Sequence, residues 1–289
     1  MFNYAFFNGK LIKKDKIRIS INDPGFLYGD GIFETIRAYN GFIFKLDEHL
    51  QRLFSSSRIL RHNIDFDKNY LVEALDKLVA RNKLKKCNAY IKIIITRGNY
   101  KDRLKFDYSS KSNLIIIASK LIPYPDEYYK NGIKVISSSI RRNALGNDLY
   151  RYKLINYFEN IFAKNEAYFQ GAQEAIFLTK DRIILEGSIS NVFFVKKEVI
   201  HTPPITQNIL PGITRDIVID LCNKNNLKVS QRNIHYHDII VADEIFLTSS
   251  IMEIMPVREF DKYKIGERIP GSITSGLMLL YKLETEKNT

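Results

Sequence analysis

Cysteine is scarce in this sequence of 289 residues, and long apolar runs are missing from it. The two cysteines, Cys87 and Cys222, lie far apart and form no Cys-x-x-Cys motif, which argues against a disulfide framework and a cysteine-based zinc site. No apolar run is long enough to cross a bilayer, and the first ten residues lack the basic start and small-residue cleavage site of a signal peptide. We therefore expect a cytoplasmic protein that does not bind a membrane.

Acidic residues are too few to balance the basic ones, and the formal net charge is +12. A basic surface attracts polyanions through counterion release. The lysines are nevertheless dispersed, with no run of five and no interleaved aromatic platform of the kind that single strands need. We expect no nucleic-acid partner, because solvated lysines or a general attraction for anionic small molecules explain the charge equally well.

Two further motifs are missing. No Gly-x-Gly-x-x-Gly follows an expected strand, which excludes a Rossmann domain. His235 and His237 alternate within an expected strand, without a nearby carboxylate or cysteine pattern, so we predict no metal site.

Expected strands and helices are mixed along the chain, which indicates an α+β protein with mixed sheets and several hairpins. The length suits two modest domains, and residues 119–129, with Pro123 and Pro125, have the composition of a linker. After a hairpin in residues 1–20 and a turn at 22–25, the expected strands are 32–39, 89–96, 114–119, 133–139, 174–179, 182–186 paired with 192–196, 229–234 and 244–248, and the expected helices are 46–60, 70–82, 156–169, 214–223 and 273–283.

Lys153 is the central candidate for chemistry. It follows a polar turn at residues 143–148 and precedes the apolar periodicity of Ile155, Phe158, Ile161 and Phe162, so we expect it where a loop enters a helix. Burial among neighbouring tyrosines disfavours the ammonium form, and a neutral lysine is a nucleophile that can form a Schiff base. The alternative is a lysine that snorkels from a helix start into water.

Three other segments carry groups that suit a heterocyclic, phosphorylated cofactor. Glu186 ends an expected strand before small hydroxylated residues, where its carboxylate could reach a ring nitrogen, although an ordinary strand-end glutamate is the simpler interpretation. Residues 211–215 (Pro-Gly-Ile-Thr-Arg) place free N–H groups at a helix start, which suits a phosphate, while an N-capping threonine explains the same pattern. Residues 248–250 (Thr-Ser-Ser) end another strand, and Arg52 lies on an early helix.

These groups together are what pyridoxal phosphate requires of a protein. In order and wording the sequence resembles the class IV (fold type IV) pyridoxal-phosphate enzymes, which include branched-chain and D-amino-acid aminotransferases and 4-amino-4-deoxychorismate lyase. The resemblance covers nearly the whole chain, through residues 28–35 (Tyr-Gly-Asp-Gly-Ile-Phe-Glu-Thr), 49–53 (His-Leu-Gln-Arg-Leu), 153–157 (Lys-Leu-Ile-Asn-Tyr), 186–191 (Glu-Gly-Ser-Ile-Ser-Asn), 211–215 and 253–257 (Glu-Ile-Met-Pro-Val).

The resemblance implies a role for each matching residue. Lys153 would bind the cofactor as a Schiff base and move the proton at the substrate carbon, and Glu186 would keep the ring nitrogen protonated. Phosphate ligands would be Arg52, Ser250 and the amides of Ile213 and Thr214. Tyr157 would reach the ring oxygen, and Ser190, Asn191 and Ser249 would complete the cofactor site.

The resemblance also implies a domain organisation. Residues 1–118 would form a small α/β domain and residues 130–289 a larger cofactor-binding domain, joined by the linker 119–129. In this two-domain fold the cofactor would lie between the domains, and a homodimer would close the site around a small amino-bearing substrate.

The substrate side decides among the family's reactions, and it favours the lyase. Residues 92–98 (Lys-Ile-Ile-Ile-Thr-Arg-Gly) resemble the corresponding strand of the lyase, where branched-chain enzymes typically have an arginine in place of Lys92. Thr35 matches a threonine of the lyase and a glycine of branched-chain enzymes. Lys92, Arg97 and Arg103 are candidates for the two substrate carboxylates, and Tyr28 is a further substrate-side candidate; a lysine on the exposed face of a half-buried strand is the alternative for Lys92.

Other segments favour transamination. Residues 33–41, the Thr-Pro-Pro at 202–204 and Tyr157 are common among the aminotransferases of the family. A D-amino-acid enzyme is less expected, because residues 101–104 do not reproduce the Arg-x-His pair typical of that group. A branched-chain L-amino-acid aminotransferase that uses 2-oxoglutarate is therefore the first alternative, and a D-amino-acid enzyme the second.

Overall fold

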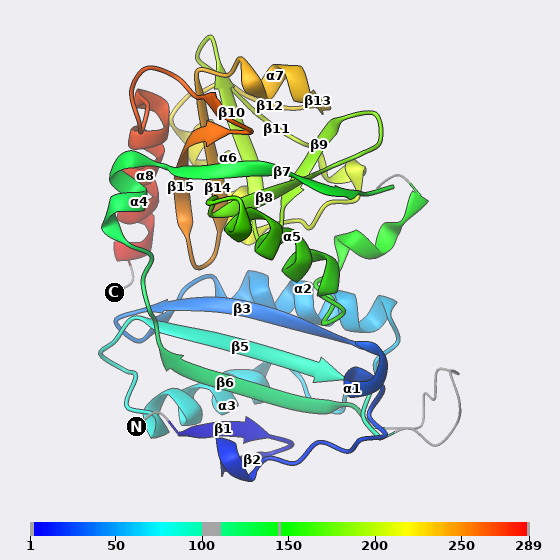
Figure 1. The fold of residues 1–289 in the computed structure, drawn as a ribbon. Helices are drawn as coiled ribbons and strands as arrows, with labels where there is room; N and C mark the ends of the chain where they lie inside the picture. Colours follow the sequence, from blue (N-terminus) through cyan, green and yellow to red (C-terminus); the bar gives the residue numbers. More distant parts are fainter. Residues whose placement is uncertain (1–2, 100–110, 144–145, 288–289) are drawn as a thin grey trace. The chain divides into compact units, whose positions relative to one another are not determined.

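The computed structural model describes residues 3–99, 111–143 and 146–287, and it divides into two compact units (Figure 1). Unit 1 contains the described residues up to Ile122 together with Tyr152–Tyr157, and unit 2 contains those of Pro123–Arg151 and Phe158–Lys287. The segment that carries Lys153 therefore belongs to unit 1, whereas the sequence analysis assigned it to the C-terminal domain.

Unit 1 is built on an antiparallel sheet, which has six strands among the described residues, in the order β2-β1-β6-β5-β3-β4. The alternation of β-branched residues predicted the long strands, and a turn at Asn40 and Gly41 joins β3 to β4. The elements are β1 (Tyr4–Phe7), β2 (Lys10–Lys13), η1 (Lys14–Lys16), α1 (Pro24–Tyr28), β3 (Gly31–Tyr39), β4 (Phe42–Ile43), α2 (Leu46–Ile59), α3 (Lys68–Arg81), β5 (Ala89–Thr96) and β6 (Asn113–Lys120).

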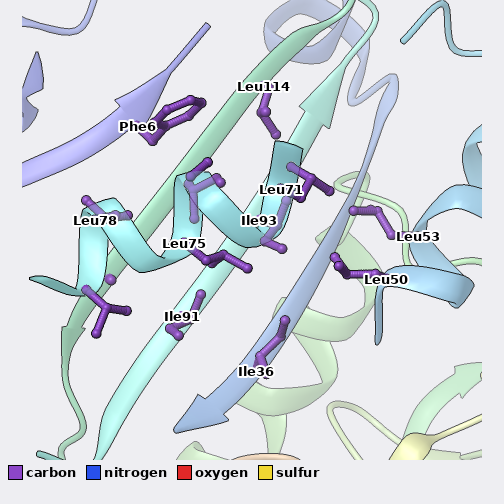
Figure 2. Packing of buried hydrophobic residues seen from close by; sticks show 14 of the residues in the cluster. Phe6, Ile36, Leu50, Leu53, Leu71, Leu75, Leu78, Ile91, Ile93 and Leu114 are labelled. Carbon is purple, nitrogen blue, oxygen red and sulfur yellow. The ribbon is translucent and has the colours of Figure 1, made fainter. Parts of the chain in front are cut away.

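Helices α2 and α3 bury their apolar stripes against one face of this sheet (Figure 2). Leu50 and Leu53 of α2 have the i, i+3 spacing of an amphipathic helix, as do the leucines of α3. They pack on alternate residues of the strands, including Ile36 of β3 and Ile93 of β5. The strand residues between these, such as Thr35 and Lys92, consequently point to the opposite face.

Unit 2 is built on a mixed sheet, which has ten strands among the described residues. The path is β12-β11-β10-β14-β15-β7-β8-β9-β13, with β16 paired to β15, and the pairs β11/β12, β7/β15 and β7/β8 are parallel. The elements are α4 (Asp126–Asn131), β7 (Ile133–Arg141), η3 (Asp148–Arg151), α5 (Phe158–Phe169), β8 (Glu174–Leu178), β9 (Ile183–Gly187), β10 (Asn191–Lys196), β11 (Val199–Thr202), η4 (Ile205–Gln207), α6 (Ile213–Lys224), β12 (Val229–Gln231), β13 (Ile234–His235), α7 (Tyr236–Ile240), β14 (Glu244–Ser249), β15 (Glu253–Phe260), β16 (Tyr263–Lys264) and α8 (Ser272–Glu286).

The α+β class expected from the sequence is confirmed, but several local predictions are wrong. Strands β9 and β10 do not pair with each other, because β9 lies between β8 and β13, and β10 lies between β11 and β14. The expected linker 119–129 ends in the short helix α4. His237 lies in α7 and not in a strand with His235. In each case non-local pairing or a short helix overrides a pattern that is only a few residues long.

Candidate active site

Lys153 lies in an extended segment that pairs with β3, five residues before α5 begins at Phe158. The amide of Phe33 donates to the carbonyl of Lys153 at 2.9 Å, and the amide of Ile155 donates to that of Gly31 at 3.0 Å. Leu154 packs on the core of unit 1, so the lysine side chain projects to the other face. The predicted position at a helix entrance is therefore wrong, because pairing with β3 replaces the local helical pattern.

Aromatic rings surround the amine of Lys153. Its Nζ lies 4.7 Å from the ring centre of Phe33 and 6.0 Å from that of Tyr157. These two rings meet edge to face, with their centres 5.4 Å apart. The lysine is half-buried, as expected, and its position is defined by backbone pairing on one side and ring faces on the other.

The glycines of residues 28–31 allow this segment to lie against β3. Gly29 has a φ of +72°, and a Cβ at this position would lie 2.9 Å from the Cβ of Asn156. A Cβ on Gly31 would lie 2.5 Å from the carbonyl oxygen of Ile95 and 2.8 Å from the Cδ1 of Ile155. Side chains at either position would displace the lysine segment, which explains the Gly-Asp-Gly motif physically.

The outer face of β3 and β5 carries the proposed substrate-side residues. Thr35 stands directly opposite Lys92 in the strand pair. The Nζ of Lys92 lies 4.4 Å from the ring centre of Phe33, so two ammonium groups, those of Lys92 and Lys153, lie over the same ring. Burial lowers the pKa of Lys92, because the charged form loses solvation. Tyr28, at the end of α1, is exposed.

Arg97 is committed to structural contacts. Its side chain is buried and donates to both carboxylate oxygens of Asp30, at 2.5 and 3.0 Å, and to the carbonyls of Leu60 and Arg61. Burial would raise the pKa of Asp30, but hydrogen bonds from His62 and Arg97 lower it to about 2. These contacts indicate an anchor for the end of β5 and not a substrate ligand, while Arg103 lies outside the described residues.

Arg52 projects from α2 towards β3, where Glu34 binds it. The Arg52 guanidinium donates to both oxygens of the Glu34 carboxylate, each at 2.7 Å, and His49 Nδ1 lies 2.8 Å from Glu34 Oε2. Sequence reasoning found Arg52 but missed Glu34, whose role depends on a contact across 18 residues of chain.

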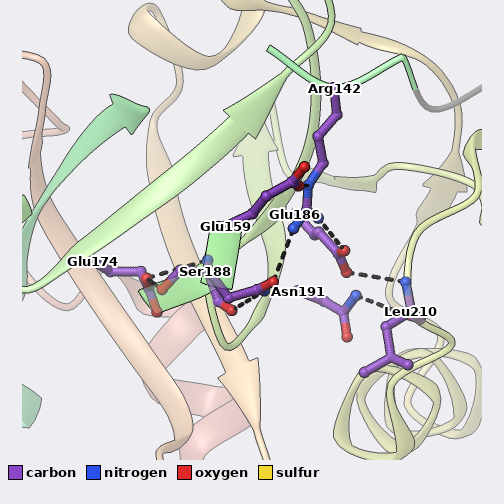
Figure 3. A network of polar contacts seen from close by, with 8 residues as sticks. Arg142, Glu159, Glu174, Glu186, Ser188, Asn191 and Leu210 are labelled. Atoms are coloured by element: carbon purple, nitrogen blue, oxygen red, sulfur yellow. Dashed lines mark hydrogen bonds and ion pairs between the residues drawn. The ribbon is translucent and has the colours of Figure 1, made fainter. Parts of the chain in front are cut away.

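In unit 2, Glu186 near the end of β9 is buried and bound at both oxygens (Figure 3). Arg142 Nη1 donates to Oε1 at 3.0 Å, and the amide of Leu210 donates to Oε2 at 3.0 Å. The guanidinium carbon of Arg142 lies 3.5 Å from the ring centre of Phe177, and Glu159 accepts from its Nε at 3.2 Å. Sequence analysis missed Arg142, for which no local signal exists beyond its place after β7.

A second buried carboxylate lies beside this pair. Glu174 of β8 is fully buried and accepts hydrogen bonds from the amide and the hydroxyl of Ser188. Ser190 Oγ lies 3.4 Å from the same carboxylate, and Asn160 donates to the carbonyl of Ser188 and accepts from Arg142. The loop 187–190 is thus fixed at several points, although the sequence suggested only its small hydroxylated character.

The N-terminus of α6 has no side-chain cap. Its N-cap residue is Gly212, where a Cβ would lie 1.9 Å from the Oδ1 of Asn191, so only glycine fits. Helix α8 also follows a glycine, but there the carboxylate of Glu244 accepts from the amides of Ile273 and Thr274, at 3.1 and 2.7 Å. An anion therefore fits the start of α6 in the way that Glu244 fits the start of α8.

Hydroxyl groups follow the neighbouring strand β14. The Thr248 hydroxyl is buried without a hydrogen-bond partner, and Thr248 pairs with Asn191 of β10. Ser249 accepts from the amide of Met252 at 3.3 Å, and Ser250 lies in the turn between β14 and β15. The uncapped amides, the orphaned hydroxyl and the serines form a donor set that suits a phosphate group.

Metal and membrane features are absent from the described part of the chain. Residues 3–99, 111–143 and 146–287 contain no group of three or more His, Cys, Asp or Glu that could hold a metal ion. Within the same residues no helix has the length and apolar character needed to cross a bilayer. The cytoplasmic location stays a prediction.

A family model and several curated proteins match the sequence. The model described as amino-transferase class IV matches residues 31–260. A putative branched-chain-amino-acid aminotransferase of Methanocaldococcus jannaschii is 36% identical over 96% of this chain and 94% of its own length. A D-alanine aminotransferase of Bacillus licheniformis is 35% identical over 94% of both chains. The aminodeoxychorismate lyase of Bacillus subtilis is 34% identical over 96% of this chain and 94% of its own.

Solved structures agree with this assignment. The branched-chain amino acid aminotransferase of Escherichia coli matches with a TM-score of 0.92 and 31% identity, over 97% of this chain and 93% of the other. A branched-chain amino acid aminotransferase from T.th., solved with pyridoxamine 5'-phosphate, also matches with a TM-score of 0.92, at 28% identity over 99% and 95% of the two chains.

Proposed function

Since this chain belongs to the class IV amino-transferase family, we propose that it is a pyridoxal-phosphate-dependent enzyme in which Lys153 binds the cofactor covalently. The observation that carries the proposal is the placement of the Lys153 amine over Phe33 and Tyr157 by backbone pairing with β3. A lysine held in this way has a fixed position from which to form a Schiff base and to move a proton.

Glu186 and the phosphate-type donors fit the same cofactor. The bound pyridine ring would supply an electron sink for the substrate's reacting carbon. Glu186 would face the protonated ring nitrogen, and Arg142 holds its carboxylate in place. The amides of Ile213 and Thr214, the hydroxyl of Ser250 and the guanidinium of Arg52 would bind the phosphate, with Ser190, Asn191 and Ser249 supporting that region.

For the reaction itself we propose cleavage of 4-amino-4-deoxychorismate to 4-aminobenzoate and pyruvate. The pair of Thr35 and Lys92 on the outer face of β3 and β5 supports this choice, because a half-buried ammonium favours an anionic substrate. Lys153 would remove the proton from C4, and loss of the enolpyruvyl side chain as pyruvate leaves an aromatic ring. No second substrate and no water are consumed.

The second candidate is transamination between an amino acid and a keto acid such as 2-oxoglutarate. It is favoured by the names of two of the three relatives described above, the branched-chain and the D-alanine aminotransferases. In that reaction the same Lys153 would move the proton between the substrate carbon and the cofactor. The difference lies in whether the substrate carries a leaving group beside the reacting carbon.

One assay separates the two reactions. The purified protein loaded with cofactor is mixed with 4-amino-4-deoxychorismate, and 4-aminobenzoate and pyruvate are measured, with Lys153→Ala as the control. Turnover that is lost in the control supports the lyase. Absence of both products, with transfer of an amino group from a branched-chain L- or a D-amino acid to 2-oxoglutarate, supports the aminotransferase. Full activity of Lys153→Ala in either assay refutes the proposal.

We also propose that the protein is a homodimer, with α5 in the interface. The inner side of α5 is lined by Ala163 and Ala167, whereas large apolar side chains lie exposed on its outer side: Phe158, Ile161, Phe162, Tyr168 and Phe169. An apolar stripe of this kind is typical of a surface that a partner covers. Light scattering should give twice the chain mass, and Ile161→Glu should halve it, while Leu279→Glu on the exposed side of α8 should not.

A further inference from the structure

We propose that Glu34 is a positioning residue that orients Arg52 and thereby sets the preference of the protein for a phosphorylated cofactor. The proposal rests on the assignment of Arg52 to the cofactor phosphate made above. Glu34 itself would touch neither the cofactor nor the substrate. Its effect on phosphate binding would pass entirely through the guanidinium of Arg52.

The geometry of the cluster is closed around the carboxylate. Glu34 lies on β3 and is 1% exposed. Oε1 accepts from Arg52 Nε at 2.7 Å, and Oε2 accepts from Arg52 Nη2 at 2.7 Å. His49 Nδ1, one turn earlier on α2, lies 2.8 Å from Oε2. The carboxylate is therefore held by two residues of the facing helix, and its position cannot change without moving both.

This arrangement fixes one edge of the guanidinium. Glu34 takes the Nε edge, and a planar guanidinium presents its other edge, formed by Nη1 and Nη2, in the opposite direction. A flexible arginine loses side-chain entropy when it is immobilised on an anion. Here Glu34 has already fixed the side chain, so Arg52 is prepared for a phosphate before one arrives.

The charge states support a permanent ion pair. Burial would raise the pKa of Glu34, but Arg52 and His49 lower it to about 2. Burial lowers the pKa of His49, and this outweighs the opposing effect of the Glu34 carboxylate. At neutral pH the cluster thus contains an ionised Glu34, a charged Arg52 and a neutral His49. No other buried carboxylate in the described part of unit 1 takes both a guanidinium and an imidazole within 3.0 Å.

The test compares two forms of the cofactor. Dissociation constants for pyridoxal phosphate and for pyridoxal, which lacks the phosphate, are measured from the absorbance of the Schiff base with Lys153. Glu34→Gln should weaken the binding of pyridoxal phosphate by about 10-fold to 100-fold, as expected for loss of a charge-assisted contact, and leave that of pyridoxal unchanged. Equal losses for the two cofactors would show a merely structural role and overturn the proposal.

A double-mutant cycle identifies the route of the effect. Arg52→Ala should itself reduce the preference for the phosphorylated cofactor, and Glu34→Gln should add no further reduction in the Arg52→Ala background. Additive effects would overturn the role of Glu34. If Arg52→Ala leaves the preference unchanged, the assignment of Arg52 to the phosphate has failed, which is a different result from failure of the positioning role.

Two further variants guard against a folding defect. Glu34→Asp keeps the charge with a shorter side chain, and it should retain part of the preference that Glu34→Gln loses. Asp30→Asn removes another carboxylate that binds an arginine within unit 1, and it should leave the preference unchanged. The ³¹P signal of bound pyridoxal phosphate should shift in Glu34→Gln and not in Asp30→Asn, and a shift common to both would contradict the proposal.

Discussion

Arg142 donates a hydrogen bond of 3.0 Å to the carboxylate of Glu186, and both side chains are almost completely buried. A buried ion pair contributes little to stability when compared with apolar replacements, but removing one partner leaves an uncompensated charge. The pair therefore makes Glu186 dependent on Arg142, a residue that is remote from it in the sequence.

Arg142→Met should lower the free energy of unfolding by about 3 kcal/mol, because Glu186 would remain buried without its charged partner. Urea titration of the cofactor-free protein measures this loss. Arg232→Met is the matched control, since its partner Asp238 is partly exposed, and it should cost less than about 1 kcal/mol. Equal losses in the two variants would show that Arg142 is no more important than a surface arginine.

Asp30 should make stability depend on acidic pH. Its pKa is lowered to about 2 in the folded protein from its usual value of 3.8, so the folded state holds its proton more weakly than the unfolded state. The resulting stabilisation, about 1 kcal/mol once solvent screening of this partly exposed group is allowed for, is fully present above pH 4 and is lost as the pH falls to about 2. Asp30→Asn should be less stable at pH 7 and show a flatter decline between about pH 4 and pH 2.

Chemical denaturation at a series of pH values checks this slope. The control is Asp47→Asn, because Asp47 is 72% exposed in its contact with Lys68 and should contribute little. A decline in Asp30→Asn as steep as that of the original protein would contradict the assignment.

Gly29→Ala should weaken the attachment of the Lys153 segment. The residue has a φ of +72°, where an alanine costs about 1–2 kcal/mol, and its Cβ would meet Asn156 at 2.9 Å. We expect lower stability and a smaller yield of the Schiff-base absorbance at a given concentration of pyridoxal phosphate. Gly276→Ala is the control, because α8 has open space at that position, and it should raise stability by about 1 kcal/mol.

Lys92→Met should reduce kcat/KM for the true anionic substrate by about 10-fold to 100-fold, as expected for loss of a charged contact. Lys92→Arg should retain most of the activity if only charge is needed. Steady-state kinetics with the substrate identified by the product assay provide the measurement. Unchanged kinetics in Lys92→Met would assign Lys92 to the solvated face of the strand.

Periodic patterns predicted most long elements of the fold, and local motifs predicted most candidate residues. The strand at residues 89–96 and the helix starting at Leu46 follow directly from alternation and helical spacing. The segment around Lys153 was mistaken for a helix entrance because Ile155 and Phe158 continue the spacing of α5. Its pairing with β3, more than a hundred residues earlier, has no signature within the segment.

The partners of the candidate residues were harder to predict than the residues themselves. Glu34 and Arg142 are polar side chains whose roles arise from burial beside a distant group, and one sequence does not reveal that burial. Arg97 illustrates the reverse error. It follows a strand in a family motif and suggested a substrate ligand, yet Asp30 and two carbonyls occupy its donors.

The chain enters unit 1 a second time, at Tyr152, and leaves it again after Tyr157. A gene fragment for residues 1–122 would encode β3 without the lysine that lies on it. A fragment for residues 123–287 would encode the lysine without the strand that holds it. The reactive amine is thus inherited only with the complete chain, and recombination between relatives cannot exchange the two units as independent modules.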